Sequence, residues 1–293
     1  LLKGIATSPA QPIDQRLAAA ERAEAMGLMD AELVRKLYGE IEFSVEEMSG
    51  VMARADAGPR VRALLYRVAW NMADQGVKGQ IVAKALDLAA AKGELASTAR
   101  IFAPLLGDIR PSPEQAGIAA VAAKAQYAIG RGEAADKWLD IARAGPDAQA
   151  AARLWPYAAI HAAGGQQPIA LPSYAGWRAT QDNVPPELRA RRAALVLGVL
   201  SGLGADVPDA AWLDAVEVPA GGTKPGLFAL MQGGALDARI GITVLAALAA
   251  IGDTPLAKAD PLTLSEAISA LSVVGLTEDA RALAVEILLA NGV

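Results

Sequence analysis

Side chains that could carry nucleophilic, acid–base or metal chemistry are few in this sequence. The chain has no cysteine and a single histidine, His161, which excludes cysteine nucleophiles, disulfides and metal sites built from paired imidazoles or thiolates. His161 follows Trp155, Tyr157 and Ile160 on an expected helix, and no Gly-x-Ser-x-Gly elbow accompanies it. We therefore predict a structural, helix-end histidine, and no catalytic residue, metal site or cofactor.

Two further patterns resemble ligand sites only superficially. The segment 221–226 reads Gly-Gly-Thr-Lys-Pro-Gly, whereas a phosphate-binding loop has four residues between its glycines and a helix that opens directly after Gly-Lys-Ser/Thr. Asp206, Asp209 and Asp214 lie close together in the chain but lack the spacing of a calcium-binding loop. We expect a turn at the first pattern and solvated surface at the second.

The charge distribution excludes a nucleic-acid footprint. The formal net charge is −5, and residues 193–293 hold eleven acidic and four basic side chains. The one dense basic cluster is Arg189, Arg191 and Arg192, with Arg178 upstream. Because neither half is strongly basic, we expect these arginines on a solvated face or in interdomain ion pairs, and no nucleic acid as partner.

Aromatic side chains give the strongest indication of a binding site. Trp155, Tyr157, Tyr174 and Trp177, followed by Arg178, gather beside and within a proline-rich central segment. Tryptophan and tyrosine supply much of the binding energy at protein interfaces. We predict these five residues as partner-binding residues, while a second reading stays open, in which the rings fold back and fill an interdomain core.

The elements that would position these residues are helices. Apolar residues make up 53% of the chain but aromatic residues only 4%, with alanine dominant, which suits closely packed helices. Ser44, Ser112 and Thr263 each precede a glutamate or glutamine by three residues, which is the capping-box spacing of a helix start. No stretch alternates as a strand would, so we predict an all-α protein.

No segment is expected to span a membrane, although the mean hydropathy of +0.28 is high. The longest uncharged stretch, 154–177, is interrupted by three prolines. The apolar runs 193–205 and 240–252 have 13 residues each, fewer than the roughly 20 needed to cross a bilayer. These two runs are predicted to be buried core helices.

A unit of helix, glycine turn and helix recurs along the chain. It is centred on Gly27, Gly93, Gly130 and Gly275. The intervals of 66 and 37 residues between the first three glycines correspond to helical-hairpin repeats of 33 to 37 residues.

The second helix of one unit resembles the tetratricopeptide repeat family. Ala135, Leu139 and Ala142 reproduce that family's small, large and small residues, and a looser match is formed by Thr98, Phe102 and Leu105. The chain departs from the family in lacking the tryptophan and the Leu-Gly pair of the first helix. The resemblance covers about the first 165 and the last 30 residues, and it implies a right-handed α-solenoid of stacked antiparallel helical hairpins that binds proteins.

Three regions are expected. Residues 1–165 form a repeat region that is similar to tetratricopeptide repeats, 166–186 form a long loop rich in proline, and 187–293 form an irregular helical region that ends in a repeat-like hairpin. A loop of more than 20 residues is uncommon within a compact domain, so a functional loop or a boundary is expected there.

The function expected from these features is that of a non-enzymatic scaffold or adaptor, with another protein or a peptide as partner. Two alternatives stay open: a helical carrier or enzyme with an apolar ligand in a cavity lined from 193–205 and 240–252, and a structural domain of a larger envelope protein. The 18 arginines against 9 lysines suggest a bacterial source. The start at Leu1-Leu2-Lys3 suggests a processed chain, and with the lack of cysteine it favours the periplasm.

Overall fold

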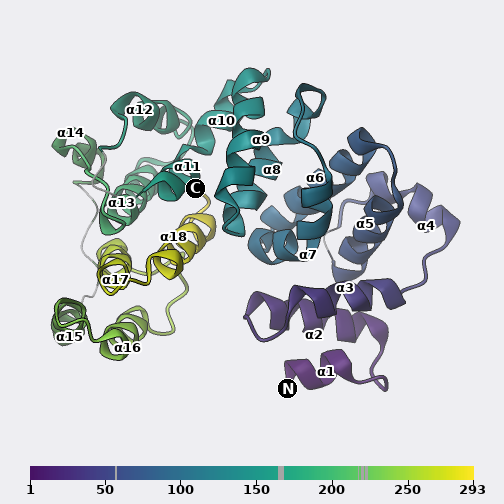
Figure 1. Cartoon of the computed structure of the whole chain (residues 1–293), viewed down its shortest axis with the longest axis horizontal. Coiled ribbons are helices and arrows are strands. Elements are labelled where there is room, and N and C mark those ends of the chain that lie inside the picture. Colours follow the sequence, from purple (N-terminus) through teal and green to yellow (C-terminus); the bar gives the residue numbers. More distant parts are fainter. Residues whose placement is uncertain (57, 164–167, 217, 219–220, 222–223) are drawn as a thin grey trace. The chain divides into compact units, whose positions relative to one another are not determined.

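The computed structural model is all-α and describes residues 1–56, 58–163, 168–216, 218, 221 and 224–293. Within these residues there are eighteen α-helices, three short 3₁₀ helices and no strand, beyond one isolated bridge between Pro168 and Asp206. The chain divides into two compact units, Leu1–Pro146 and Asp147–Val293. Figure 1 labels the helices along the chain.

Unit 1 holds the first nine α-helices and two 3₁₀ helices. They are α1 (Leu2–Thr7), α2 (Ile13–Ala25), α3 (Ala31–Glu40), α4 (Val45–Ser49), η1 (Val51–Ala53), α5 (Pro59–Asn71), α6 (Gln75–Ala90), α7 (Leu95–Asp108), η2 (Pro113–Gln115), α8 (Ala116–Ala128) and α9 (Gly132–Ala144). Neighbours along the chain pack against each other, as α5 does with α6 and α8 with α9.

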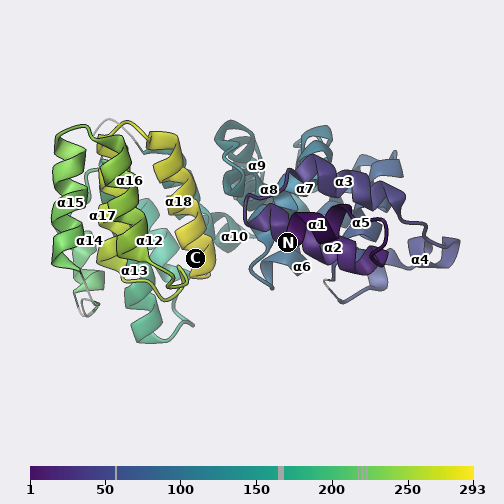
Figure 2. The ribbon, with the colours of Figure 1, turned by 90° about the horizontal axis from the view of Figure 1, so that it is seen from below.

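Unit 2 holds the remaining helices. They are α10 (Ala148–Arg153), α11 (Trp155–Ala162), α12 (Leu171–Ala179), α13 (Pro186–Gly202), α14 (Asp209–Trp212), η3 (Leu213–Ala215), α15 (Pro225–Leu236), α16 (Ile240–Ile251), α17 (Pro261–Val273) and α18 (Thr277–Ala290). Figure 2 shows α15, α16, α17 and α18 side by side, and the packing of α15 on α16 and of α16 and α18 on α17 agrees with this view.

The four glycine turns predicted from the sequence are confirmed. Gly27, Gly93, Gly130 and Gly275 have φ between +67° and +86° and join α2 to α3, α6 to α7, α8 to α9 and α17 to α18. At each turn the next residue donates its backbone N–H to a carbonyl five residues back, for example Leu28 to Ala23 at 2.7 Å. This is the Schellman hydrogen bond, for which a left-handed glycine is the usual residue.

Of the predicted capping boxes, only the one at Ser44 forms as predicted. The amide of Glu47 donates to Ser44 Oγ at 3.1 Å, and the amide of Ser44 donates to the Glu47 carboxylate at 2.9 Å. The prediction at Thr263 is wrong because α17 begins three residues earlier than such a cap implies: Asp260 is the N-cap and accepts from the Thr263 amide at 2.9 Å. Ser112 precedes a 3₁₀ turn and its side chain caps no backbone amide.

The predicted loop 166–186 is corrected by the structure. Residues 164–167 lie outside the described residues, and α12 occupies Leu171–Ala179. Pro172 lies in the first turn of α12, and Pro186 is the first residue of α13. Proline is tolerated at these positions because first-turn amides have no partner within the helix. The division between the units falls at Pro146 and Asp147 rather than within 166–186.

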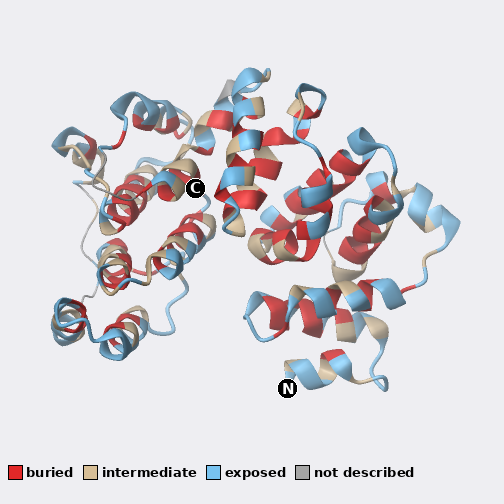
Figure 3. Cartoon of the chain, in the orientation of Figure 1, coloured by how far each residue is buried: buried red, intermediate tan, exposed pale blue. Residues whose placement is uncertain are grey.

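Within each unit, the residues coloured as buried lie mainly on the sides of the helices that face other helices (Figure 3). In unit 1, Tyr66 contacts Tyr38 and Phe102 edge-on, with ring centroids 5.6 and 5.2 Å apart. In unit 2, α13 lies so close to α17 that a Cβ on Gly202 would fall 2.7 Å from the Ser265 carbonyl oxygen. In the described residues, no helix combines the length and the apolar character needed to cross a membrane.

Candidate functional site

A cavity of about 440 Å³ opens in unit 1 between α2 and the first turns of α5 and α7. Helix α2 directs Ala18, Glu21, Arg22 and Ala25 toward it. These residues follow one another at intervals of three, one and three positions and therefore share one face of the helix. The alanine side chains are small and leave room for the cavity, while Glu21 and Arg22 contribute charge to its wall.

The wall of this cavity contains a buried ion pair. Arg62 and Glu21 have side chains 5% and 8% exposed, and Arg62 Nε donates to Glu21 Oε2 at 3.1 Å. Arg62 also donates to Glu94 at 2.7 Å, and the Tyr38 hydroxyl donates to Glu21 Oε1 at 2.5 Å. Since Glu21 accepts on both oxygens, its charge is fully compensated inside the unit.

The pKa values reflect this arrangement. Burial alone would lower the pKa of Arg62, but its hydrogen bond and the charge of Glu21 raise it above its usual value. Burial, and then the adjacent Glu21 carboxylate, raise the pKa of the Tyr38 hydroxyl well above its usual value. Arg62 therefore stays charged and Tyr38 stays neutral throughout the physiological range.

A second buried carboxylate ties α2 to α7. Glu24 is 3% exposed, and it accepts from Arg100 Nε at 2.5 Å and from the Ser97 hydroxyl. Glu21 and Glu24 were not among the residues predicted from the sequence. The signal that could have found them is their position four and seven residues after the buried Leu17, which places them on the packed face of α2.

A second cavity of about 270 Å³ adjoins the first and shares Ala18 and Pro59 with it. Arg60 lies over the Phe43 ring at 5.2 Å and pairs with Glu47 at 3.5 Å and with Asp14 at 3.8 Å. We call the two cavities together the α2 groove. Five acidic and five basic side chains line it: Asp14, Glu21, Glu47, Asp56, Glu94, Arg22, Arg54, Arg60, Arg62 and Lys92.

Two cations of the α2 groove are available to a ligand. Arg22 and Lys92 are exposed, and neither side chain has an ion-pair or hydrogen-bond partner in the part of the chain that the structure describes. The acidic residues Glu21, Glu47 and Glu94, by contrast, are already paired with arginines. Among the described residues, the larger cavity therefore has two unpaired cations and no unpaired carboxylate, since both of its acidic residues, Glu21 and Glu94, are paired with Arg62.

The predicted partner-binding aromatics form a cluster in unit 2. The ring centroids of Trp155, Tyr174 and Trp177 lie 5.7 to 6.1 Å apart. Tyr174 and Trp177 are 5% and 1% exposed, and Trp155 is half-buried. Tyr157 is also buried, and its hydroxyl donates to the Val293 carbonyl oxygen at 2.6 Å. Tyr157, Tyr174 and Trp177 therefore stabilise unit 2 internally instead of presenting a surface to a partner.

Arg178 likewise has an internal partner. It donates to Asp214 Oδ1 at 2.5 Å, and the Tyr174 hydroxyl donates to Asp214 Oδ2 at 2.8 Å. Burial works to raise the pKa of Asp214, but the hydrogen bonds from Arg178 and Tyr174 hold it below its usual value. The trio joins α12 to η3.

The other patterns in the sequence also serve the fold of unit 2. Arg191 donates to the Ala259 carbonyl at 2.7 Å, and Arg192 donates to Gln181 at 2.8 Å. These arginine contacts lie within one unit and are not interdomain ion pairs. His161 is half-buried near the end of α11. Lys224 donates to the Ala249 carbonyl at 3.2 Å, while residues 222 and 223 of the glycine-rich segment lie outside the described residues.

An apolar cavity of about 410 Å³ lies in unit 2 between α13, η3 and α17. Ala194 and Gly198 line it from the apolar run 193–205, as the alternative carrier hypothesis expects. The opposite wall comes from Pro261 and Leu262 of α17 and not from 240–252. Trp212 also lines the cavity.

No protein-family model, curated protein or solved structure matches this chain. In the described ranges, no group of three or more histidine, aspartate or glutamate side chains is placed to hold a metal ion.

Proposed function

We propose that this protein is a non-enzymatic scaffold that holds an extended segment of another protein in the α2 groove. The observation that carries the proposal is the pair of cations with unpartnered side chains, Arg22 and Lys92, on the wall of a cavity whose other charges are held in place by the ion pairs of Arg62 with Glu21 and Glu94. Such a wall is preorganised, so binding does not have to order it first. We infer a segment with acidic side chains as the ligand.

The dimensions of the groove set the length of the segment. Its lining runs from Asp14 to Ala25 along α2, a distance of about 17 Å at 1.5 Å per helical residue. An extended chain covers this distance with about five residues. Acidic side chains on one face of the segment would contact Arg22 and Lys92, and its other side chains would pack against the apolar walls of the groove.

Selection from a random peptide library displayed on phage, with the full chain as bait, tests the proposal. We expect enrichment of peptides with two or more acidic residues, and a loss of affinity of about tenfold or more for Arg22→Glu and for Lys92→Glu. Lys137→Glu is the matched control, since Lys137 is an exposed lysine of the same unit outside the groove. Selected peptides that bind all three variants equally would exclude the α2 groove.

A second candidate function is favoured by the apolar cavity of unit 2. We propose, as the alternative, a carrier for a small apolar ligand, because Trp212, Val216 and Leu262 give that cavity an apolar lining. Native mass spectrometry of the purified chain would detect a retained ligand. Binding of an apolar fluorescent probe that Leu262→Asp abolishes would support this function, and an empty chain that takes up no probe would exclude it.

Two finer features belong to the proposal. We propose that the hairpins of unit 1 form a right-handed α-solenoid of the tetratricopeptide type, for which the Schellman turns at Gly27, Gly93 and Gly130 are the support. The location in the periplasm of a bacterial cell stays a prediction, and cell fractionation would test it.

A further inference from the structure

The hairpin of α15 and α16 exposes more large apolar side chains than its own packing explains. Exposed fractions are 55% for Leu230, 83% for Leu236, 68% for Leu245 and 62% for Leu248, with Ile240 and Ile242 at 49% and 39%. Within 225–252 the charged residues are Asp237 and Arg239, in the turn between the helices, and they pair with each other at 2.8 Å. An apolar patch of this extent on a protein surface marks an interaction site.

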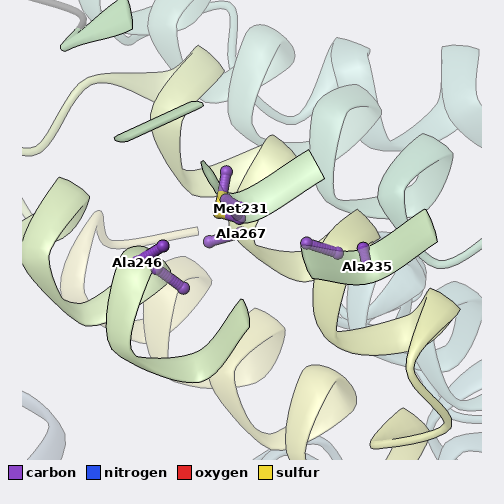
Figure 4. Packing of buried hydrophobic residues seen from close by; sticks show 6 residues of the cluster. Met231, Ala235, Ala246 and Ala267 are labelled. Carbon is purple, nitrogen blue, oxygen red and sulfur yellow. The ribbon is translucent and has the colours of Figure 1, made fainter. Parts of the chain in front are cut away.

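In an ordinary amphipathic hairpin the large apolar side chains face the core. In the hairpin of α15 and α16 the small side chains face the core and the large ones face outward. The face that packs on α17 consists mainly of alanines: Met231, Ala235 and Ala246 lie against Ala267 of α17 (Figure 4). The leucines point the other way. Burying leucine contributes far more free energy than burying alanine, so the outer face has the composition of a core that a partner completes.

The outer face of α16 is a continuous stripe. Ile242, Leu245, Leu248 and Ala249 are all exposed and are spaced by three, three and one residues, which places them on one side of a helix. On α15, Leu230 and Leu236 are exposed on either side of the open Gly233. Neither helix contributes a charged side chain to this surface.

We infer that this outer face, defined by Leu230, Ile242, Leu245 and Leu248, binds a second copy of the same chain across a two-fold axis. A two-fold contact brings the same patch to itself, and this patch contains no charge that would meet its like. A lipid surface is disfavoured because interfacial helices carry lysine and arginine along their polar side, and α15 and α16 contain neither.

The size of the face fits a weak, reversible dimer. Each helix has 12 residues, hence a length of about 18 Å, and two packed helices are about 20 Å wide. The face therefore measures on the order of 400 Å² in projection on each copy, or about 800 Å² for the two copies together, which is below the standard interface size and in the range of weak, transient contacts. We expect a dimer dissociation constant in the micromolar range.

Sedimentation velocity of the full chain over about 1 to 100 µM tests the inference. The expected result is a concentration-dependent rise from the 30.1 kDa chain toward twice that mass. Leu245→Glu and Leu248→Glu are each expected to raise the dimer dissociation constant by about a hundredfold or more, because each change acts twice in a symmetric interface. Leu213→Glu, at a leucine that is 74% exposed on η3, is expected to leave it unchanged.

Other outcomes would overturn the inference. A chain that stays monomeric at 100 µM, or a dimer that survives both substitutions, excludes this interface. A monomer that floats with phosphatidylcholine or phosphatidylglycerol vesicles, and loses this property in Leu245→Glu, would assign the face to lipid instead. Circular dichroism of each variant checks that the helices stay folded. If Leu245→Glu unfolds unit 2, Leu245→Ser provides the milder change, and a dimer that Leu245→Ser leaves unweakened also excludes this interface.

Discussion

At the scale of single residues, the buried charges of unit 1 decide how α2 is held. Glu21 and Glu24 are both nearly inaccessible, and each is satisfied by an arginine from a different helix, Arg62 on α5 and Arg100 on α7. A buried ion pair adds little net stability compared with apolar side chains of equal size, but removing one partner leaves an uncompensated buried charge. These pairs therefore fix the position of α2, and with it the α2 groove.

Replacing Glu21 by alanine tests this role. The change leaves Arg62 buried without its main partner and the Tyr38 hydroxyl without its acceptor, so we expect unit 1 to lose about 3 to 5 kcal/mol of stability. Chemical denaturation followed by circular dichroism measures the loss. Glu32→Ala, which removes an exposed i,i+4 pair with Lys36, is the control and should cost less than about 0.5 kcal/mol.

Asp214 makes the stability of unit 2 dependent on pH in acid. Its pKa is held below 3.8 in the folded chain by Arg178 and Tyr174, so its stabilising contribution is present above the unfolded pKa and is lost as the pH falls through the folded pKa. We expect Asp214→Asn to be less stable than the parent chain at pH 7, with the difference shrinking below about pH 4. A difference that stays constant from pH 7 to pH 2.5 would contradict this account.

At the scale of elements, the close approach of α13 and α17 depends on Gly198 and Gly202. A Cβ on Gly202 would lie 2.7 Å from the Ser265 carbonyl oxygen and 3.1 Å from Ile268 Cγ2. We expect Gly202→Ala to destabilise unit 2 by about 1 to 3 kcal/mol, because the backbone of α17 must move. Gly176→Ala on α12 is the matched control, since its Cβ would meet nothing within 4 Å, and it should be neutral or stabilising.

The sequence predicts some elements well for a physical reason. A glycine after a helical run predicts a left-handed turn, and the turns at Gly27, Gly93, Gly130 and Gly275 form as expected because few other residues adopt that conformation. Helix α12 was missed because prolines in 166–186 suggested a break. Proline is compatible with the first turn of a helix, whereas proline further along breaks the helix. The sequence does not show where the first turn of α12 lies, so the prolines alone do not distinguish a helix start from a loop.

The candidate site was much less predictable than the fold. Glutamates on a helix usually face solvent, so residue type does not lead one to expect that Glu21 and Glu24 are buried. Their burial depends on Arg62 and Arg100, which come from helices distant in the chain. For the aromatic residues Tyr174 and Trp177 the sequence left two readings open, a surface for a partner and rings that fold back into a core, and their burial agrees with the second. Their burial within unit 2 follows from tertiary packing that spacing does not reveal.

At the scale of the whole molecule, the two compact units give the chain two separate cores. Residues 1–146 and 147–293 each contain their own buried apolar residues. We expect each piece, expressed alone, to give a helical circular dichroism spectrum and a cooperative thermal transition. A piece that is unfolded alone and becomes helical when the other is added would show that the cores are not independent.

Hydrogen–deuterium exchange of the full chain, with and without a selected acidic peptide, tests whether the α2 groove holds a partner segment. We predict slower exchange of backbone amides in α2 and in the first turns of α5 and α7, the elements that line the groove, and no change for Arg22→Glu at the same peptide concentration. Protection confined to α13 and α17 around the apolar cavity of unit 2, or protection that Arg22→Glu leaves intact, would contradict it.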